Sequence, residues 1–196
     1  MNLLIRSLRV KGNILKCIDG DTDNLEQAAA SSAQIARQRE FARQVQELLA
    51  RRYDHPPAAF VHSFGCQQNQ SDGEKLSGML AEMGYGFTDS PSYADLVIYN
   101  TCAVRENAED RVFGNVGALK KVKRARPGML IGLCGCMMQQ QAVADRIRAS
   151  YPYVDLVFGT HALHTLPAQM RFAIVILCGS IGGFLGLKSR ESKRRS

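Results

Sequence analysis

Residues 96–102 read LVIYNTC, in which four apolar residues lead directly into a polar turn that ends in a cysteine. Two further stretches have the same order, AAFVHSFGC at 58–66 and MLIGLCGC at 129–136. After each cysteine, apolar residues recur at the three- and four-residue spacing of a helix. Apolar runs that alternate with helices are typical of a parallel sheet covered on both faces. We therefore expect an α/β fold over residues 58–167, a three-layer domain of the flavodoxin-like or Rossmann-like kind.

The same pattern predicts where the elements begin and end. The helix after the first turn is expected to start at a capping box of Ser71 and Glu74 and to stop at Gly84. Strands are expected at 58–64, 96–99, 129–133 and 154–158.

The flanking segments differ in composition from this repeating part. Residues 23–52 hold few helix breakers and a broken apolar stripe, which predicts one or two helices outside the core. The sequence His-Pro-Pro at 55–57 ends this helical extension, which we assign to residues 1–57. Residues 168–196 form an atypical tail that is first apolar and then basic.

The bulk composition is that of an ordinary globular protein. The chain has 196 residues, 45% of them hydrophobic and 22% charged, so we expect one core with tails rather than disorder or a fibrous repeat. The formal net charge is +7, and the last nine residues supply most of this excess. Six cysteines are present, and the amino terminus lacks the apolar stretch and cleavage site of a secretory signal. We therefore expect a cytoplasmic protein with reduced thiols, whose patterned cysteines serve metal binding or catalysis.

Cys66, Cys102 and Cys136 each lie in one of the three strand-to-helix turns. Such turns emerge at one edge of a parallel sheet, where α/β proteins bind their ligands. We therefore expect the three thiols to meet there and to hold one iron-sulfur cluster. Each thiol also precedes an expected helix, and the positive end of the helix dipole favours the thiolate.

Three other interpretations of these cysteines stay open. They could be buried thiols that act as small hydrophobes, although polar turns are poor core sequences. A zinc site could use Cys134 as a fourth thiolate, but the tight paired spacing of structural zinc sites is missing. Catalysis by Cys66 alone is disfavoured, because no arginine follows closely enough to form a phosphatase-type loop.

The turns belong to longer motifs, which are GCQQNQSD at 65–72, NTCAVRENAE at 100–109, GLCGCMMQQ at 132–140, YPYVDLVFGT at 151–160 and LHTLP at 163–167. In this order they resemble the amino-terminal domain of the radical-SAM tRNA methylthiotransferases. The resemblance covers residues 58–167 and implies a 4Fe-4S cluster held by Cys66, Cys102 and Cys136. Cys134 lies outside the ligand position of the motif, and the resemblance implies no catalytic residue in this domain.

The motifs are closer to the branch that modifies isopentenyladenosine in tRNA, since Gln67 and Asn69 follow the first cysteine and VRE at 104–106 follows the second. This implies a transferase that inserts sulfur, with tRNA containing isopentenyladenosine and a sulfur donor as partners. Three thiolate ligands would leave one iron open for an exogenous sulfur species. We expect Gln67, Asn69, Asn100 and Thr101 either to donate hydrogen bonds that tune the cluster or only to satisfy the backbone of the turns.

The chain departs from the family after residue 167. The Cys-x-x-x-Cys-x-x-Cys motif, which in the family holds a second 4Fe-4S cluster and S-adenosylmethionine, is absent. We therefore expect a fragment or truncated product that does not catalyse methylthiolation alone. The uncharged run at 172–187 is shorter than the ~20 residues that usually span a bilayer, so a frameshifted or readthrough tail is favoured over a membrane anchor.

Two alternative functions are weighed against this one. A non-catalytic nucleotide- or flavin-binding module is disfavoured, because no GxGxxG turn follows any expected strand. A membrane-tethered regulatory fragment rests on the tail alone. One basic run is interpreted as a solvated helix end rather than as a phosphate-contacting patch for tRNA, and it comprises Lys120, Lys121, Lys123, Arg124 and Arg126.

Overall fold

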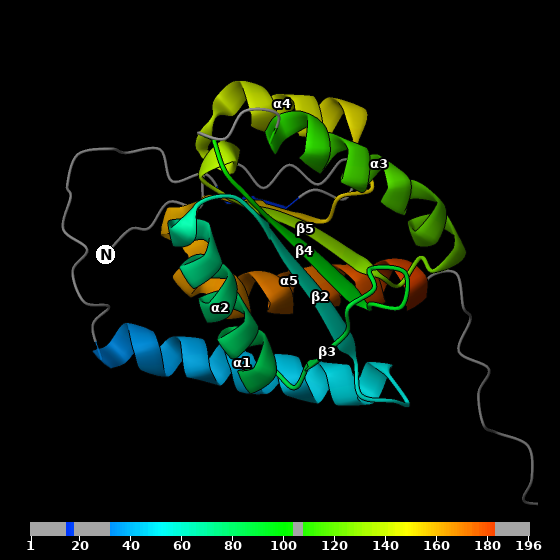
Figure 1. Cartoon of the computed structure of the whole chain (residues 1–196). Coiled ribbons are helices and arrows are strands. Elements are labelled where there is room, and N and C mark those ends of the chain that lie inside the picture. The colour runs from blue at the N-terminus through cyan, green and yellow to red at the C-terminus, as the bar shows by residue number, and fades with distance from the viewer. Residues whose placement is uncertain (1–14, 18–31, 104–107, 183–196) are drawn as a thin grey trace, which may run out of the picture.

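The computed structural model describes residues 15–17, 32–103 and 108–182. Over this part of the chain, short strands alternate with helices, as the sequence predicts (Figure 1). The strands are β1 (Leu15–Cys17), β2 (Ala58–Phe64), β3 (Gly86–Phe87), β4 (Leu96–Thr101), β5 (Leu130–Gly135) and β6 (Leu156–Phe158). The helices are α1 (Ser32–Arg52), α2 (Gln67–Glu82), α3 (Ala108–Ala125), α4 (Gln141–Ser150) and α5 (Leu166–Gly182), with the 3-10 helices η1 (Cys136–Gln139) and η2 (Thr160–Thr165).

The described strands form one sheet in the order β1-β6-β5-β4-β2-β3, and every neighbouring pair is parallel. When β2 is counted as the first strand, β2 to β6 follow the order 2-1-3-4-5 of flavodoxin-like folds. The predicted fold class is therefore confirmed. The sequence pattern misses β1, which pairs with β6 and comes from the segment that was expected to be helical.

Helices cover both faces of the sheet, with α1, α2 and α5 on one face and α3 and α4 on the other (Figure 1). Side chains alternate along each strand, so successive residues enter different cores. In β4, Leu96 and Ile98 pack with the first set of helices, whereas Val97 and Tyr99 pack with the second. Every residue of β4 and β5 is buried for this reason.

Helix α1 belongs to the core, contrary to the expectation of helices outside it. Its Ala42, Val45 and Leu49 are buried together with side chains of α2 and α5. The rest of the helix surface is largely polar, and Arg43 there forms ion pairs with Glu40 at 2.7 Å and with Glu47. The apolar stripe of α1 is narrow, and charged and other polar residues occupy most of the rest of the helix surface. The sequence pattern alone therefore does not show that the stripe is buried.

Helix α5 also contributes to the core, although most of it falls in the predicted tail. Leu166, Met170 and Ala173 lie at helical spacing and are buried on the same side of the sheet as α1. The helix takes the beginning of the apolar run 172–187 into the fold, and residues 183–196 lie outside the described part. Among the helices that the structure describes, none has both the length and the apolar character needed to cross a bilayer.

Two aspartates clamp the amino ends of the strands. Asp95, directly before β4, accepts a hydrogen bond from the backbone N–H of Ala58 at 2.9 Å and forms an ion pair with Arg126 at 2.5 Å. Asp155, shortly before β6, accepts one from the backbone N–H of Ile131 at 2.8 Å. Asp95 therefore joins the start of β2 to the start of β4, and Asp155 joins the start of β5 to the start of β6.

Lys123 completes the second clamp from the end of α3. Its ammonium group lies 2.7 Å from the Asp155 carboxylate and also donates to the carbonyl oxygen of Met129. Burial raises the pKa of Asp155, and Lys123 opposes this rise. The interpretation of the basic run as a solvated helix end is therefore wrong for Lys123 and Arg126, which form ion pairs across the fold. The remaining cations of the run are exposed, namely Lys120, Lys121 and Arg124.

Replacing Lys123 with alanine should leave the Asp155 carboxylate buried without its cation. Removal of one partner from a buried ion pair costs about 3–5 kcal/mol. Urea unfolding of Lys123→Ala, followed by circular dichroism, should show a loss of this size. Lys121→Ala, on the exposed side of the same helix, is the matched control and should change the free energy of unfolding by less than about 0.5 kcal/mol. Equal losses of unfolding free energy in both variants would contradict a stabilising role of the Lys123–Asp155 ion pair.

Candidate metal centre

The three cysteines of the predicted ligand set lie at the carboxyl ends of three neighbouring strands, with Cys66 after β2, Cys102 after β4 and Cys136 after β5. In the sheet register, Phe64 of β2 pairs with Thr101 of β4, and Thr101 pairs with Gly135 of β5. Adjacent parallel strands lie about 4.8 Å apart, so this register brings the three turns side by side. The prediction that these turns share one edge of the sheet is confirmed.

This edge also contains the topological switch point of the sheet. From β2 the chain passes to β3 on one side, and β4 then lies on the other side of β2. Open α/β sheets bind their ligands beyond the carboxyl ends of the strands at such a point. Cys66 and Cys102 follow the two strands that meet there.

Direct contacts connect the three cysteine turns. The Sγ atom of Cys136 accepts a hydrogen bond from the backbone N–H of Ala103 at 2.9 Å and lies 3.6 Å from the carbonyl oxygen of Thr101. The thiols of Cys102 and Cys136 also contact each other. On the β2 side, Gly65 packs so closely that an added Cβ atom would lie 2.6 Å from the Cβ of Cys102. The described residues hold no group of three Cys, His, Asp or Glu side chains already arranged around one metal-ion position.

Cys134 differs from the three edge cysteines in that it packs in one of the two cores. It is fully enclosed in the core formed with α1, α2 and α5, two residues before Cys136. Burial raises the pKa of its thiol, and the Asp72 carboxylate adds to this rise. A thiol that packs in an apolar core acts as a small hydrophobe. Cys66, Cys102 and Cys136 belong to neither core, so the donor set at the edge fits a group with three thiolate ligands, and the zinc interpretation loses its fourth thiolate.

Two of the three thiols lie at the start of a helix, as expected. Cys66 is the N-cap residue of α2, and Cys136 opens η1. The expectation of a helix directly after Cys102 falls on residues 104–107, which lie outside the described residues. At Cys136, burial raises the pKa of the thiol and outweighs the N–H of Ala103, which acts in the opposite direction. The predicted lowering of the thiol pKa is therefore wrong at this residue. A 3-10 helix of four residues has few aligned peptide dipoles to offset desolvation.

Helix α2 starts earlier than the predicted capping box. It begins at Gln67, so Ser71 and Glu74 lie inside it. The turn after β2 is short enough for the chain to enter the helix directly, which leaves Cys66 at the helix start itself. The helix ends just before the predicted stop at Gly84.

The four polar residues predicted near the cluster have different environments, since Gln67 is exposed whereas Asn69, Asn100 and Thr101 are buried. The Thr101 hydroxyl donates to the carbonyl oxygen of Cys134 at 2.6 Å. The Asn69 amide donates to the amide oxygen of Asn100 and to the carbonyl oxygen of Thr101, and the Asn100 amide donates to the carbonyl oxygen of Asn69. The buried three thus satisfy the backbone at the strand ends, and the other predicted role, hydrogen bonds that tune a cluster, stays a prediction. The backbone N–H of Ala103 donates a hydrogen bond to the sulfur of Cys136, for which the sequence has no signal.

Gly135 permits the close approach of β4 and β5 at this edge. Its φ of +104° lies in the region that favours glycine. A Cβ atom there would overlap the carbonyl oxygen of Thr101 and would lie 2.7 Å from Oδ1 of Asn100. A larger residue would therefore push the turn that carries Cys136 away from β4.

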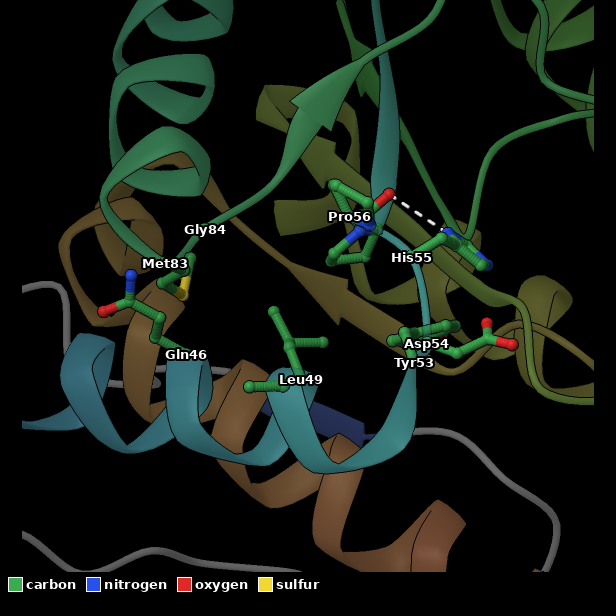
Figure 2. A pocket seen from close by; sticks show the side chains of 10 residues that line it. Gln46, Leu49, Tyr53, Asp54, His55, Pro56, Met83 and Gly84 are labelled. Atoms are coloured by element: carbon green, nitrogen blue, oxygen red, sulfur yellow. Dashed lines mark hydrogen bonds between the residues drawn. The ribbon is translucent and has the colours of Figure 1, made fainter.

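A separate pocket of about 350 Å³ lies at the opposite, amino edge of the sheet (Figure 2). It is bounded by the ends of α1 and α2 and by the segment that enters β2, and its lining includes Leu49, Tyr53, Pro56 and Met83. None of its lining residues is a cysteine. A nucleotide- or flavin-binding module would hold its ligand at the carboxyl edge, so this pocket does not support that alternative.

Comparison with known proteins matches residues 58–159 to the Uncharacterized protein family UPF0004. Several curated relatives carry the name tRNA-2-methylthio-N(6)-dimethylallyladenosine synthase. The protein of Acetivibrio thermocellus is 49% identical over 147 residues, which is 74% of this chain and 31% of that protein. The protein of Clostridium beijerinckii is 53% identical over 117 residues, or 60% and 26% of the two chains. The protein of Desulforamulus reducens is 47% identical over 130 residues, or 66% and 28%. The chain thus spans less than a third of the length of these relatives.

Gly135→Ala should distort the carboxyl edge of the sheet, because the new methyl group meets the backbone of β4 and the residue keeps a positive φ. Together these effects should lower the free energy of unfolding by about 2–5 kcal/mol in urea titrations. Gly117→Ala is the control, since nothing lies within 4 Å of a Cβ added at this position inside α3. That substitution should stabilise the protein by about 0.5–1 kcal/mol. An unchanged free energy of unfolding in Gly135→Ala would contradict the prediction, because it would show that β4 and the turn after β5 can move apart without loss of stability.

Proposed function

The chain belongs to the family UPF0004, the amino-terminal domain of the tRNA methylthiotransferases, and from this premise we propose that it binds a 4Fe-4S cluster that serves methylthiolation of isopentenyladenosine in tRNA. The observation that carries the proposal is the arrangement of Cys66, Cys102 and Cys136. These residues are distant in the chain, yet each follows one of three adjacent parallel strands. The relatives named above supply the substrate class, since their names refer to dimethylallyladenosine in tRNA.

In this proposal each part of the edge has a definite task. Cys66, Cys102 and Cys136 would hold the cluster, and Cys134 stays in the core. The N–H of Ala103 stabilises negative charge on the sulfur of Cys136. When bound, a 4Fe-4S cluster with three thiolate ligands supplies an iron with an open position for an exogenous sulfur species.

The remaining steps of the reaction need more than this chain. We propose that S-adenosylmethionine and a second 4Fe-4S cluster act in the part of the longer relatives that this chain does not cover. The chain by itself then binds a cluster but performs no methylthiolation. The extent of the matches supports this division, since they cover 31% and 26% of the length of two of those relatives.

Anaerobic reconstitution with iron and sulfide tests the ligand set. The wild-type chain should take up about four iron atoms, the content of one 4Fe-4S cluster. Cys66→Ala, Cys102→Ala and Cys136→Ala should each lose most of this iron and its visible absorbance, because two thiolates do not retain the cluster. Iron content and absorbance are measured after gel filtration.

Cys134→Ala is the matched control for this experiment, because Cys134 lies in the same strand end but in the core. It should retain the iron content of the wild type, as should Cys17→Ala and Cys178→Ala. If Cys134→Ala loses iron as Cys136→Ala does, the three-thiolate set is wrong.

The division of labour has its own test. Incubation of the reconstituted chain with S-adenosylmethionine, a reductant, sulfide and isopentenyladenosine-containing tRNA should yield no methylthiolated nucleoside by mass spectrometry. Addition of a longer relative, such as the Acetivibrio thermocellus protein, should yield product and verifies the assay. Product formed by the chain alone would refute the proposed division.

A further inference from the structure

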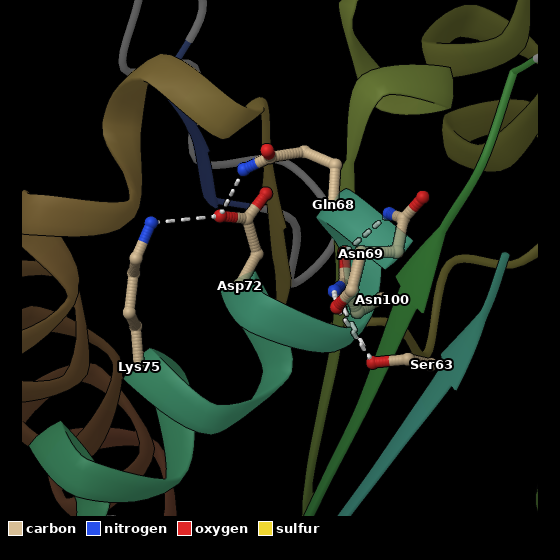
Figure 3. Close-up of polar contacts among 6 residues, drawn as sticks. All are labelled: Ser63, Gln68, Asn69, Asp72, Lys75 and Asn100. Atoms are coloured by element: carbon tan, nitrogen blue, oxygen red, sulfur yellow. Dashed lines mark hydrogen bonds and ion pairs between the residues drawn. The ribbon is translucent and has the colours of Figure 1, made fainter. Parts of the chain in front are cut away.

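Two buried asparagines join the ends of β2 and β4 at the thiol edge (Figure 3). Asn69 lies in the first turn of α2, and Asn100 is the penultimate residue of β4. The Nδ2 group of Asn69 donates to Oδ1 of Asn100 at 3.1 Å and to the carbonyl oxygen of Thr101 at 3.0 Å. One amide thereby ties the helix that follows Cys66 to the residue that precedes Cys102.

The connection is reciprocal. The Nδ2 group of Asn100 donates to the carbonyl oxygen of Asn69 at 2.7 Å and to the hydroxyl of Ser63 at 3.3 Å. That hydroxyl in turn donates to the same Asn69 carbonyl at 3.1 Å. Because Asn69 and Asn100 are 2% and 0% exposed, water cannot replace any of these bonds without opening the edge.

The network reaches all three cysteine turns. The Thr101 carbonyl that accepts from Asn69 is also 3.6 Å from the thiol of Cys136. Both Nδ2 hydrogens of Asn69 are used, so the orientation of its amide is fixed and Oδ1 faces Cys66, whose Sγ lies 3.3 Å away. Asp72, on the next turn of α2, takes no part in the pair, since its carboxylate accepts from Gln68 and Lys75 (Figure 3).

We propose that Asn69 and Asn100 are positioning residues that hold the Cys66 turn against the Cys102 and Cys136 turns. The proposal rests on the proposed function, because the thiols need a fixed spacing only if they bind one ligand together. Apolar residues at the two positions could fill the space, but they would not fix the direction in which the turns meet. Directional amides between the three ligand turns fix how these turns lie against one another.

Asn69→Ala and Asn100→Ala test this role with two readouts. In the metal-free protein, phenylarsine oxide bridges pairs of close thiols, and peptide mass spectrometry identifies the bridged residues. In the reconstituted protein, an iron chelator measures how fast the cluster is lost. Each variant should capture the arsenical about tenfold more weakly and release iron about tenfold faster, as expected for the loss of two hydrogen bonds of ordinary strength.

Gln70→Ala is the matched control, because Gln70 is exposed on the same turn of α2. It should match the wild type in both readouts. Urea midpoints are measured for every variant, so that a folded protein with displaced thiols is distinguished from an unfolded one. Folded Asn69→Ala and Asn100→Ala proteins that behave within twofold of the wild type in both readouts would overturn the proposal.

The metal-free readout separates this inference from the proposed function. A wild-type chain that captures the arsenical but takes up no iron would refute cluster binding, while the effect of the asparagine variants on capture would still decide the positioning role. If both variants fail to fold, Ser63→Ala replaces them, since it removes only the outer bonds of the network. A change of the same sign in Ser63→Ala supports the proposal, and unchanged capture and iron release overturn it.

Discussion

The parallel register of β2, β4 and β5 is the constraint on which the rest of the structure depends. It sets Phe64, Thr101 and Gly135 level with one another, and a cysteine follows each of them within two residues. A slip of one residue in either pairing would turn the side chains of a whole strand to the opposite core. Because β4 and β5 are buried on both faces, the two cores strongly disfavour such a slip. The positions of the thiols are thus a consequence of how the side chains of β4 and β5 pack in the two cores.

The two edges of the sheet are held by different interactions. At the amino edge, Asp155 forms an ion pair with Lys123 in the last turn of α3, and Asp95 forms one with Arg126 just after this helix. At the carboxyl edge, neutral amides join the strand ends, and Asp72, a buried carboxylate of α2, is paired with a lysine. A fixed carboxylate among the thiols would repel an anionic cluster, whereas amides hold the turns without adding charge. The fold therefore places the ion pairs of Asp95 and Asp155 at the edge opposite the site.

At Cys136, burial has the largest influence on the pKa of the thiol. Burial raises the pKa of Cys136, although a backbone N–H already points at its sulfur. Metal ions bind thiolates, so under the proposed function cluster binding displaces the proton and becomes weaker as the pH falls. In the proposed function, the positive charge that stabilises the Cys136 thiolate would come from the iron. The backbone N–H of Ala103 adds a hydrogen bond to the same sulfur. A dipole argument based on the sequence omits the desolvation that tertiary packing imposes on the same residue.

The sequence by itself determined the order of strands and helices between residues 58 and 167 and the cysteine turn after each of the first three predicted strands. Apolar periodicity and turn residues are local signals, and they sufficed for the fold class and the shared edge. Only the tertiary structure decided that α1 and α5 enter the core, that Lys123 and Arg126 are paired, and that Asn69 meets Asn100. The side-chain contacts among these join residues 31 and 32 positions apart in the chain. A local pattern cannot identify such partners, because folding the strands into one register is what brings them together.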